Sequence, residues 1–293
     1  MNKKILYILM VLAMIAWGET WVNAKILSRY LSADELIFWR FLITTLGMIP
    51  ILWYKKLSLS ISLPNLLLAL VSAIVLALYN NAFFMGTRYG LASFGGVLVT
   101  TLTPMITFLL ISLLTRKKFI YQEIVGLLFG GIGTLIILEI WSFDANLIFS
   151  KGNIYYLVAS LLWPILTIIS AKQKNINSLI FTFYLFGFTS LIDLVFIDFQ
   201  ITNISTFDSK FLLNLILLSL YGTTFATTIY FMAVVELGSK VASSFFFLVP
   251  SSAIVFSIFF LNETINISLI LGGVFTVLAV YILNQTKRTK DFK

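Results

Sequence analysis

The sequence predicts an all-α membrane protein with ten transmembrane helices, arranged as two inverted five-helix repeats. Three observations lead to this prediction: an apolar composition, ten apolar segments of spanning length, and an internal repetition. Of the 293 residues, 60% are hydrophobic and 11% are charged, and the mean hydropathy is +1.01. A soluble domain is roughly half apolar and a quarter charged, so this composition indicates a chain built for lipid.

Each apolar segment is long enough to cross a bilayer as a helix, which takes roughly 20 residues. The predicted spans are 5–28, 35–54, 65–86, 91–115, 120–140, 152–171, 178–197, 211–235, 240–261 and 267–284. The first span follows two lysines, as a secretion signal would. However, "AWGETWVNA" offers no small-residue cleavage site, and nine further spans follow. The first span is therefore expected to remain a helix.

The basic residues predict the orientation, because Lys and Arg are retained on the cytoplasmic side of a membrane. With a cytoplasmic N-terminus, the inside segments hold fourteen basic residues: Lys3, Lys4, Lys55, Lys56, Arg116, Lys117, Lys118, Lys172, Lys174, Lys240, Lys287, Arg288, Lys290 and Lys293. The outside loops hold four: Arg29, Arg88, Lys151 and Lys210. Both termini are therefore expected in the cytoplasm. The net charge of +8 reflects this topology, and no nucleic-acid partner is expected.

An internal repeat becomes visible when the sequence is shifted by 146 residues. Trp17 then falls on Trp163, and the same shift aligns Pro104 with Pro250 and Gly126 with Gly272. Apolar helices align with one another easily, but Trp and Pro are scarce here, with six and five copies. The matches indicate a duplicated five-helix unit. Because five is odd, the second unit enters the membrane from the opposite side, which is the architecture of many secondary transporters.

The segment "AWGETWVNAK", followed by "FWRF", is similar to the signature W-G-x-x-[FW]-x-x-x-K…F-x-R-F of EamA-type permeases in the drug/metabolite transporter superfamily. The late stretch "ASSFFFLVPSSAIVFSIFFLNETINISLILGGVFTVLAVYI" resembles the end of that family's repeat. The resemblance covers about residues 5–285. It implies EamA-like repeats at 5–140 and 152–285, a basic cytoplasmic tail at 286–293, and movement of small polar metabolites or drugs by alternating access.

The chain departs from this family pattern at two acidic positions. The first repeat has Lys117 where the family has Glu, whereas the second repeat keeps Glu263. Glu19 stands where family members more often have a small or neutral residue. Any effect of this family Glu on the end of a helix is therefore expected in the second repeat only.

Charged residues inside the spans are the first candidates for function, since each costs roughly 2.5–3.5 kcal/mol near the bilayer centre and needs a partner. Glu19 is expected to line a central cavity and to bind a substrate ammonium or a coupling proton. The alternative is that Glu19, Lys25 and Arg40 neutralise one another and join the first two helices. Lys25 is expected to extend outward, and Arg40 to form a structural or gating pair with Asp34, Glu35 or Glu19.

Weaker candidates for the cavity wall are polar and aromatic residues of several spans. Tyr79, Asn80 and Asn81 can contact substrate or join helices by hydrogen bonds, and Trp17, Trp21 and Trp163 can bind a cation or pack as core. Tyr230 and Phe246 complete the set. The spans expected to line the cavity are 5–28, 65–86, 91–115, 152–171, 211–235 and 240–261.

Proline and glycine positions suggest where the helices bend or slide. Pro104, Pro164 and Pro250 each remove a backbone hydrogen bond and are expected to kink their helices. Small residues in "SFGGVLVTT" and "GLLFGGIG" allow close helix packing, either as static contacts or as rocking surfaces.

Motifs of enzymes and of ATP-driven pumps are missing. The sequence contains no G-x-x-x-x-G-K-[ST], no histidine and no cysteine. We therefore expect no enzyme, no cofactor and no metal, and a secondary transporter in the bacterial cytoplasmic membrane, with a small-molecule substrate and a proton as candidate coupling ion. Export of an amino acid or related metabolite is the first expectation. The alternatives are uptake of a cationic metabolite and a non-transporting membrane assembly subunit.

Overall fold

The structure, a computed structural model, describes residues 3–90, 92–137, 139–142, 151–197, 207–261 and 267–285. Within these ranges the chain is helical throughout, with short connections and no β-strand. The predicted tail at 286–293 and Glu263 lie outside the described residues.

The first half of the chain forms five long helices and one short 3-10 turn. They are α1 (Lys3–Leu27), α2 (Ala33–Tyr54), α3 (Leu63–Tyr89), α4 (Ala92–Thr115), α5 (Tyr121–Ile137) and η1 (Ile140–Ser142). The second half consists of α7 (Lys151–Ser170), α8 (Ser178–Leu194), α9 (Ser209–Ile216), η3 (Leu217–Thr227), α10 (Thr228–Leu237), α11 (Ser239–Ser244), η4 (Phe245–Leu248), α12 (Val249–Leu261) and α13 (Ile267–Gln285).

Six helical segments of the described chain are long and apolar enough to cross a membrane. They are Lys3–Leu27, Ala33–Tyr54, Leu63–Tyr89, Phe94–Thr115, Lys151–Ser170 and Ser209–Leu237. Shorter apolar helices cover Tyr121–Ile137, Ser178–Leu194 and Ile270–Gln285. Large apolar side chains point outward from several of these helices, with exposed fractions of 62% for Ile8 and 57% for Leu128. Such a surface suits contact with lipid.

The start of α2 shows how a local motif fixes a helix end. Ser32 and Glu35 form a capping box, in which the Ser32 hydroxyl accepts a hydrogen bond from the Glu35 backbone N–H and the Glu35 carboxylate accepts one from the Ser32 backbone N–H at 2.9 Å. These bonds satisfy backbone donors that the first helical turn leaves without partners. The five-residue connection after α1 therefore ends at a defined position.

The predicted span at 240–261 is helical, but it is not one regular α-helix. The segment consists of α11, the 3-10 turn η4, and α12, and Pro250 is the second residue of α12. Proline has no backbone N–H, so it cannot donate to the carbonyl of Phe246 one turn earlier. The tighter hydrogen-bonding pattern of η4 accommodates that missing bond.

The predicted span at 211–235 is also irregular, because its centre is the π-helix η3. Threonine hydroxyls bond to carbonyls five residues earlier: Thr223 to Leu218 at 2.9 Å and Thr224 to Ser219 at 3.1 Å. The buried Thr223 and Thr224 hydroxyl groups face α2, where they contact Arg40 and the Thr44 carbonyl. A π-helix is rare and is frequently found at functional sites.

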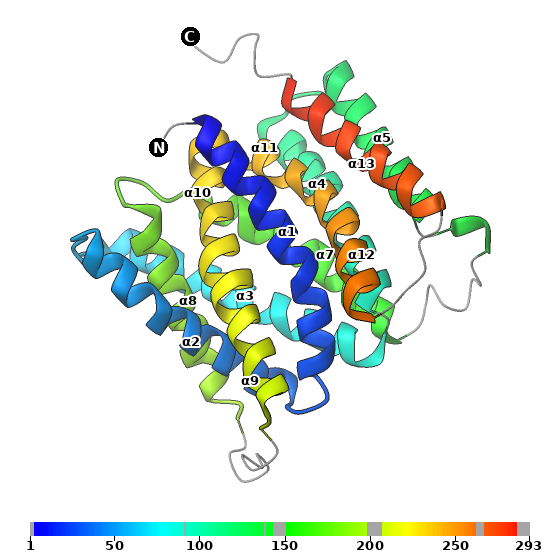
Figure 1. Ribbon diagram of the computed structural model, residues 1–293. Helices are drawn as coiled ribbons and strands as arrows, with labels where there is room; N and C mark the ends of the chain where they lie inside the picture. Colours follow the sequence, from blue (N-terminus) through cyan, green and yellow to red (C-terminus); the bar gives the residue numbers. More distant parts are fainter. Residues whose placement is uncertain are drawn as a thin grey trace.

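Corresponding helices of the two halves pack side by side in opposite directions. Gly126 of α5 lies against Leu283 of α13, whereas Gly133 lies against Gly272 and Thr276. As α5 advances, its neighbours in α13 therefore come from earlier positions, so the two helices are antiparallel. Figure 1 shows the two lying alongside each other at the edge of the bundle.

The pair α2 and α8 repeats this arrangement. The Ser190 hydroxyl donates to the Phe38 carbonyl at 3.3 Å, and the rings of Phe41 and Phe186 lie 5.7 Å apart. Here too, a later residue of α2 meets an earlier residue of α8. The start of α1 and the end of α13 lie at the same end of the bundle (Figure 1).

Candidate functional site

A small cavity lies where helices of both halves meet, and we call it the central cavity. Its volume is about 30 Å³, which is room for water but not for a metabolite. It is lined by Trp17, Thr20, Trp21, Arg40, Tyr79, Phe83, Thr100, Trp163, Phe246 and Val249. Both sequence repeats therefore contribute to its wall, and no acidic side chain is among the described residues that line it.

Aromatic rings form most of this wall. Trp17 lies 5.2 Å from Trp163 and 4.9 Å from Phe246 between ring centroids, and Tyr79 lies 4.6 Å from Trp163. Tyr230 does not line the cavity but packs behind Trp17, with its hydroxyl 2.7 Å from the Thr167 hydroxyl. The structure thus brings together the aromatic candidates that the sequence places on five different spans.

Arg40 is the charged residue of the cavity wall. Its side chain is 7% exposed, and it donates from Nε to the Thr223 hydroxyl at 2.7 Å and from Nη1 to Oδ1 of Asn80 at 2.8 Å. The expected pairing of Arg40 with a carboxylate is wrong. Among the described residues the ion pair found joins Lys240 and Glu123, and Arg40 bonds only to neutral groups.

The nearby acidic residues serve other purposes. Asp34 accepts a hydrogen bond from the Asn81 amide at 2.9 Å, which ties the start of α2 to α3. Glu35 belongs to the capping box of α2. Asn81 therefore points to the start of α2, whereas its neighbour Asn80 faces Arg40.

The structure places Glu19 outside the central cavity. It shares a face of α1 with Ile8, Leu12 and Ile15, which recur at helical spacing, whereas Trp17, Thr20 and Trp21 point to the cavity. The surroundings of Glu19 include Asn23 one turn further along α1 and Tyr221 of η3.

Lys25 binds the end of a neighbouring helix. Its ammonium group donates to the carbonyls of Thr87 at 2.7 Å and Gly90 at 2.9 Å. These carbonyls belong to the last turn of α3 and its C-cap, where a cation is favourable. Lys25 thus joins α1 to α3 without an acidic partner in the described chain.

The three prolines lie in different settings. Pro104 and Pro164 are inside α4 and α7, each of which continues on both sides of its proline. Pro250 follows the η4 turn at the start of α12. α2 contains a further internal proline, Pro50.

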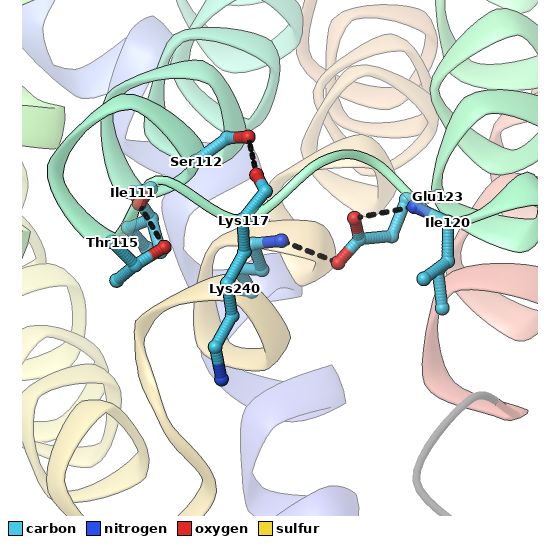
Figure 2. Close-up of polar contacts among 7 residues, drawn as sticks. All are labelled: Ile111, Ser112, Thr115, Lys117, Ile120, Glu123 and Lys240. Atoms are coloured by element: carbon cyan, nitrogen blue, oxygen red, sulfur yellow. Dashed lines mark hydrogen bonds and ion pairs between the residues drawn. The ribbon is translucent and has the colours of Figure 1, made fainter.

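An ion pair joins the two halves at one end of the bundle. Lys240 donates to Glu123 at 2.5 Å, and the second carboxylate oxygen of Glu123 accepts from the Ile120 backbone N–H at 3.3 Å (Figure 2). The side chains of Lys240 and Glu123 are 25% and 12% exposed. Figure 2 also shows Lys117 in the preceding loop, where its carbonyl accepts from the Ser112 hydroxyl.

Several residues of the site were not predicted from the sequence. α2 lines the cavity through Arg40, whereas the span at 211–235 contributes only from behind, through Tyr230 and Thr223. Thr20 and Phe83 had a usable signal, because they lie three or four residues from Trp17 and Tyr79 and therefore on the same helix faces. Thr223 and the Lys240–Glu123 pair had no such sequence signal, because their contacts depend on how helices distant in the sequence meet.

Comparisons with known proteins agree with this architecture. The model of the EamA-like transporter family matches residues 4–139 and again 150–285. An uncharacterized transporter of Archaeoglobus fulgidus is 23% identical over 96% of this chain and 98% of its own length. The uncharacterized transporter YyaM of Bacillus subtilis is 24% identical over 94% and 92%, and an uncharacterized transporter of Clostridium kluyveri is 26% identical over 98% and 96%.

The fold has a counterpart among solved structures. A crystal structure whose title reads only "Crystal structure of protein" superposes with a TM-score of 0.74, covering 97% of this chain and 98% of the other. The two sequences are 14% identical. This similarity concerns the fold alone.

Proposed function

Because the chain belongs to the EamA-like transporter family, we propose that it is a secondary transporter that moves a small polar metabolite by alternating access. The observation that supports this most is the central cavity, whose wall combines residues of both repeats. A site at a repeat interface can be exposed to either side of the membrane when one half rocks against the other.

The antiparallel packing of α5 with α13 and of α2 with α8 supports an inverted repeat with ten spans. Equivalent helices of inverted units cross the membrane in opposite senses. In this proposal both termini lie in the cytoplasm, and the protein resides in a bacterial cytoplasmic membrane. The shorter helices α5, α8 and α13 and the broken segment α11–η4–α12 then join the six long segments to complete the ten.

Export of an amino acid or related metabolite is the proposed direction. Uptake of a cationic metabolite has less support, because Arg40 lines the cavity and the described part of the chain adds no carboxylate to its wall. Glu19 remains the candidate proton carrier. It would act from outside the cavity wall, on the face of α1 next to Asn23 and Tyr221.

The test is flux through purified protein in liposomes. A labelled panel of amino acids, polyamines, choline-like cations and nucleosides should contain members that cross only when the protein is present. Protein-free liposomes are the control. Absence of both flux and binding across the whole panel would instead favour a non-transporting membrane subunit.

Proton coupling is tested separately with Glu19→Gln. The variant should fold and bind as the parent does but lose its response to an imposed pH gradient. Unchanged gradient-driven flux would assign Glu19 a structural role.

A further inference from the structure

The charge of Arg40 is not balanced by any acidic group of the described chain. The guanidinium is 7% exposed, its hydrogen-bond partners Thr223 and Asn80 are neutral, and the ion pair of the described residues lies elsewhere. A buried charge is expensive unless it is paired. Two of the five N–H groups of Arg40 are used in these bonds, so three are left for a further acceptor.

Two further donors belong to the cavity wall. The Trp163 side chain is 4% exposed, and its indole N–H lies toward the Tyr230 hydroxyl without making a hydrogen bond of standard geometry among the described residues. The Tyr79 hydroxyl lies near Arg40 on the same wall. Trp17 differs from Trp163, because its indole N–H donates to the Gly222 carbonyl at 3.0 Å.

The remaining polar groups of the wall are already engaged. Thr20 donates its hydroxyl to the Trp17 carbonyl at 2.7 Å, and Thr100 donates to the Gly96 carbonyl. The wall therefore offers one cation with two neutral donors beside it, and no carboxylate is found among the described residues that line it. This charge favours an anionic group in the cavity.

We propose that Arg40 binds the carboxylate of the transported solute, with Trp163 N–H and Tyr79 O–H as flanking donors. This inference rests on the proposed transport function. A planar guanidinium matches a carboxylate in a two-bond arrangement. One cation suits a single negative charge, whereas a phosphate ester would need more positive charge than this wall has. The rings of Trp17 and Phe246 would contact an apolar part of the same solute.

The substitutions separate charge, geometry and fold. Arg40→Gln removes the cation and should lower carboxylate flux at limiting concentration by at least ~30-fold, as expected when a buried charge pair loses one member. Arg40→Lys keeps the charge but loses the planar guanidinium group. Its carboxylate flux should lie between that of the unsubstituted protein and that of Arg40→Gln. Trp163→Phe removes one neutral donor and should cost about 5-fold. The matched controls are Arg88→Gln and Trp53→Phe at exposed positions, which should leave flux unchanged.

The experiment compares proteoliposomes supplied with labelled L-amino acids, with the same amino acids as carboxamides, and with glycerol phosphate. Carboxylate-dependent flux that is lost in Arg40→Gln and kept in Arg88→Gln supports the proposal. Equal transport of the carboxamides, or normal carboxylate flux in both Arg40 variants, overturns it while leaving the transport function intact. Flux of glycerol phosphate in place of the amino acids overturns the carboxylate assignment.

If no compound shows flux, the result counts against the proposed transport function. The carboxylate site is then tested by a binding measurement. Thermal unfolding of the detergent-solubilised protein is then followed with each compound at millimolar concentration. Stabilisation by amino acids but not by their carboxamides, absent in Arg40→Gln and present in Arg88→Gln, supports the carboxylate site. Identical melting with both series overturns it. If Arg40→Gln fails to fold, Trp163→Phe takes its place. It is judged by the same comparison of the effect of amino acids with that of their carboxamides.

Discussion

Trp17 and Trp163, which are 146 positions apart and equivalent in the two repeats, meet edge to face with their ring centroids 5.2 Å apart and an interplanar angle of 87°. When equivalent residues of two copies touch each other, the contact lies close to the axis that relates the copies. The central cavity is built around this contact.

The Trp17–Trp163 contact should be measurable as a coupling between the two halves. In a double-mutant cycle with Trp17→Leu and Trp163→Leu, we expect a coupling of about 0.5–1.5 kcal/mol, the usual value for an aromatic pair. Unfolding by denaturant in detergent micelles measures it. Strictly additive effects of the two substitutions would show that the rings do not contact each other in solution.

The Lys240–Glu123 pair should hold one end of the bundle closed. Glu123→Gln removes a partly buried ion pair worth about 1 kcal/mol, which changes the ratio of closed to open forms about 5-fold. The readout is the thiol-modification rate of Ser243→Cys, a position that is fully buried and lies near Tyr230. That rate should rise with Glu123→Gln.

Charge exchange provides the control for this ion pair. Glu123→Lys combined with Lys240→Glu should restore the slow modification rate, because the opposite charges face each other again. If the exchanged pair reacts as fast as Glu123→Gln alone, the contact does not hold the bundle closed.

The contact between α5 and α13 should not tolerate a methyl group. A Cβ at Gly133 would lie 2.8 Å from the Gly272 carbonyl oxygen, whereas a Cβ at Gly187 would meet its nearest neighbour, in Thr45, at 3.7 Å. Gly133→Ala should therefore lower the free energy of unfolding by about 1–3 kcal/mol, and Gly187→Ala should be neutral or slightly stabilising. Thermal melting of the two variants side by side distinguishes them, and equal melting temperatures would contradict the packing.

The predicted topology can be tested with single introduced cysteines. The chain has no cysteine of its own, so none has to be removed first. Single cysteines at Lys117 and Lys172 should react with a membrane-impermeant thiol reagent only from the cytoplasmic side. Cysteines at Arg29 and Lys210 should react only from outside. Labelling of all four from one side would contradict the inverted arrangement of the repeats.

Sequence reasoning identified the aromatic part of the cavity because a repeat leaves a visible trace. Trp17 and Trp163 are rare residues at one offset, and a symmetric pair of helices crosses near equivalent positions. The helical nature and apolar character of the segments followed from composition in the same way. The irregular segments η3 and η4 could not be predicted in this way. A π-helix has no clear sequence signal, and Pro250 shows only that one backbone hydrogen bond is missing.

The charged residues were harder to place, for physical reasons. Glu19 was expected in the cavity because it is an intramembrane charge, yet its spacing from Ile8 and Ile15 sets it on the opposite face from Trp17. The partners of Arg40 come from α3 and η3, and nothing local indicates which distant helix will approach. Proximity in sequence favoured Asp34 and Glu35, whose carboxylates bond to Asn81 and Ser32.

The 30 Å³ volume of the central cavity has a kinetic consequence. A space of this size admits water but not a metabolite, so the helices around it must move apart before a solute can bind. Association that requires such a movement is slower than simple docking. We therefore expect the rate of solute binding to level off as the solute concentration rises, at the rate at which the helices separate.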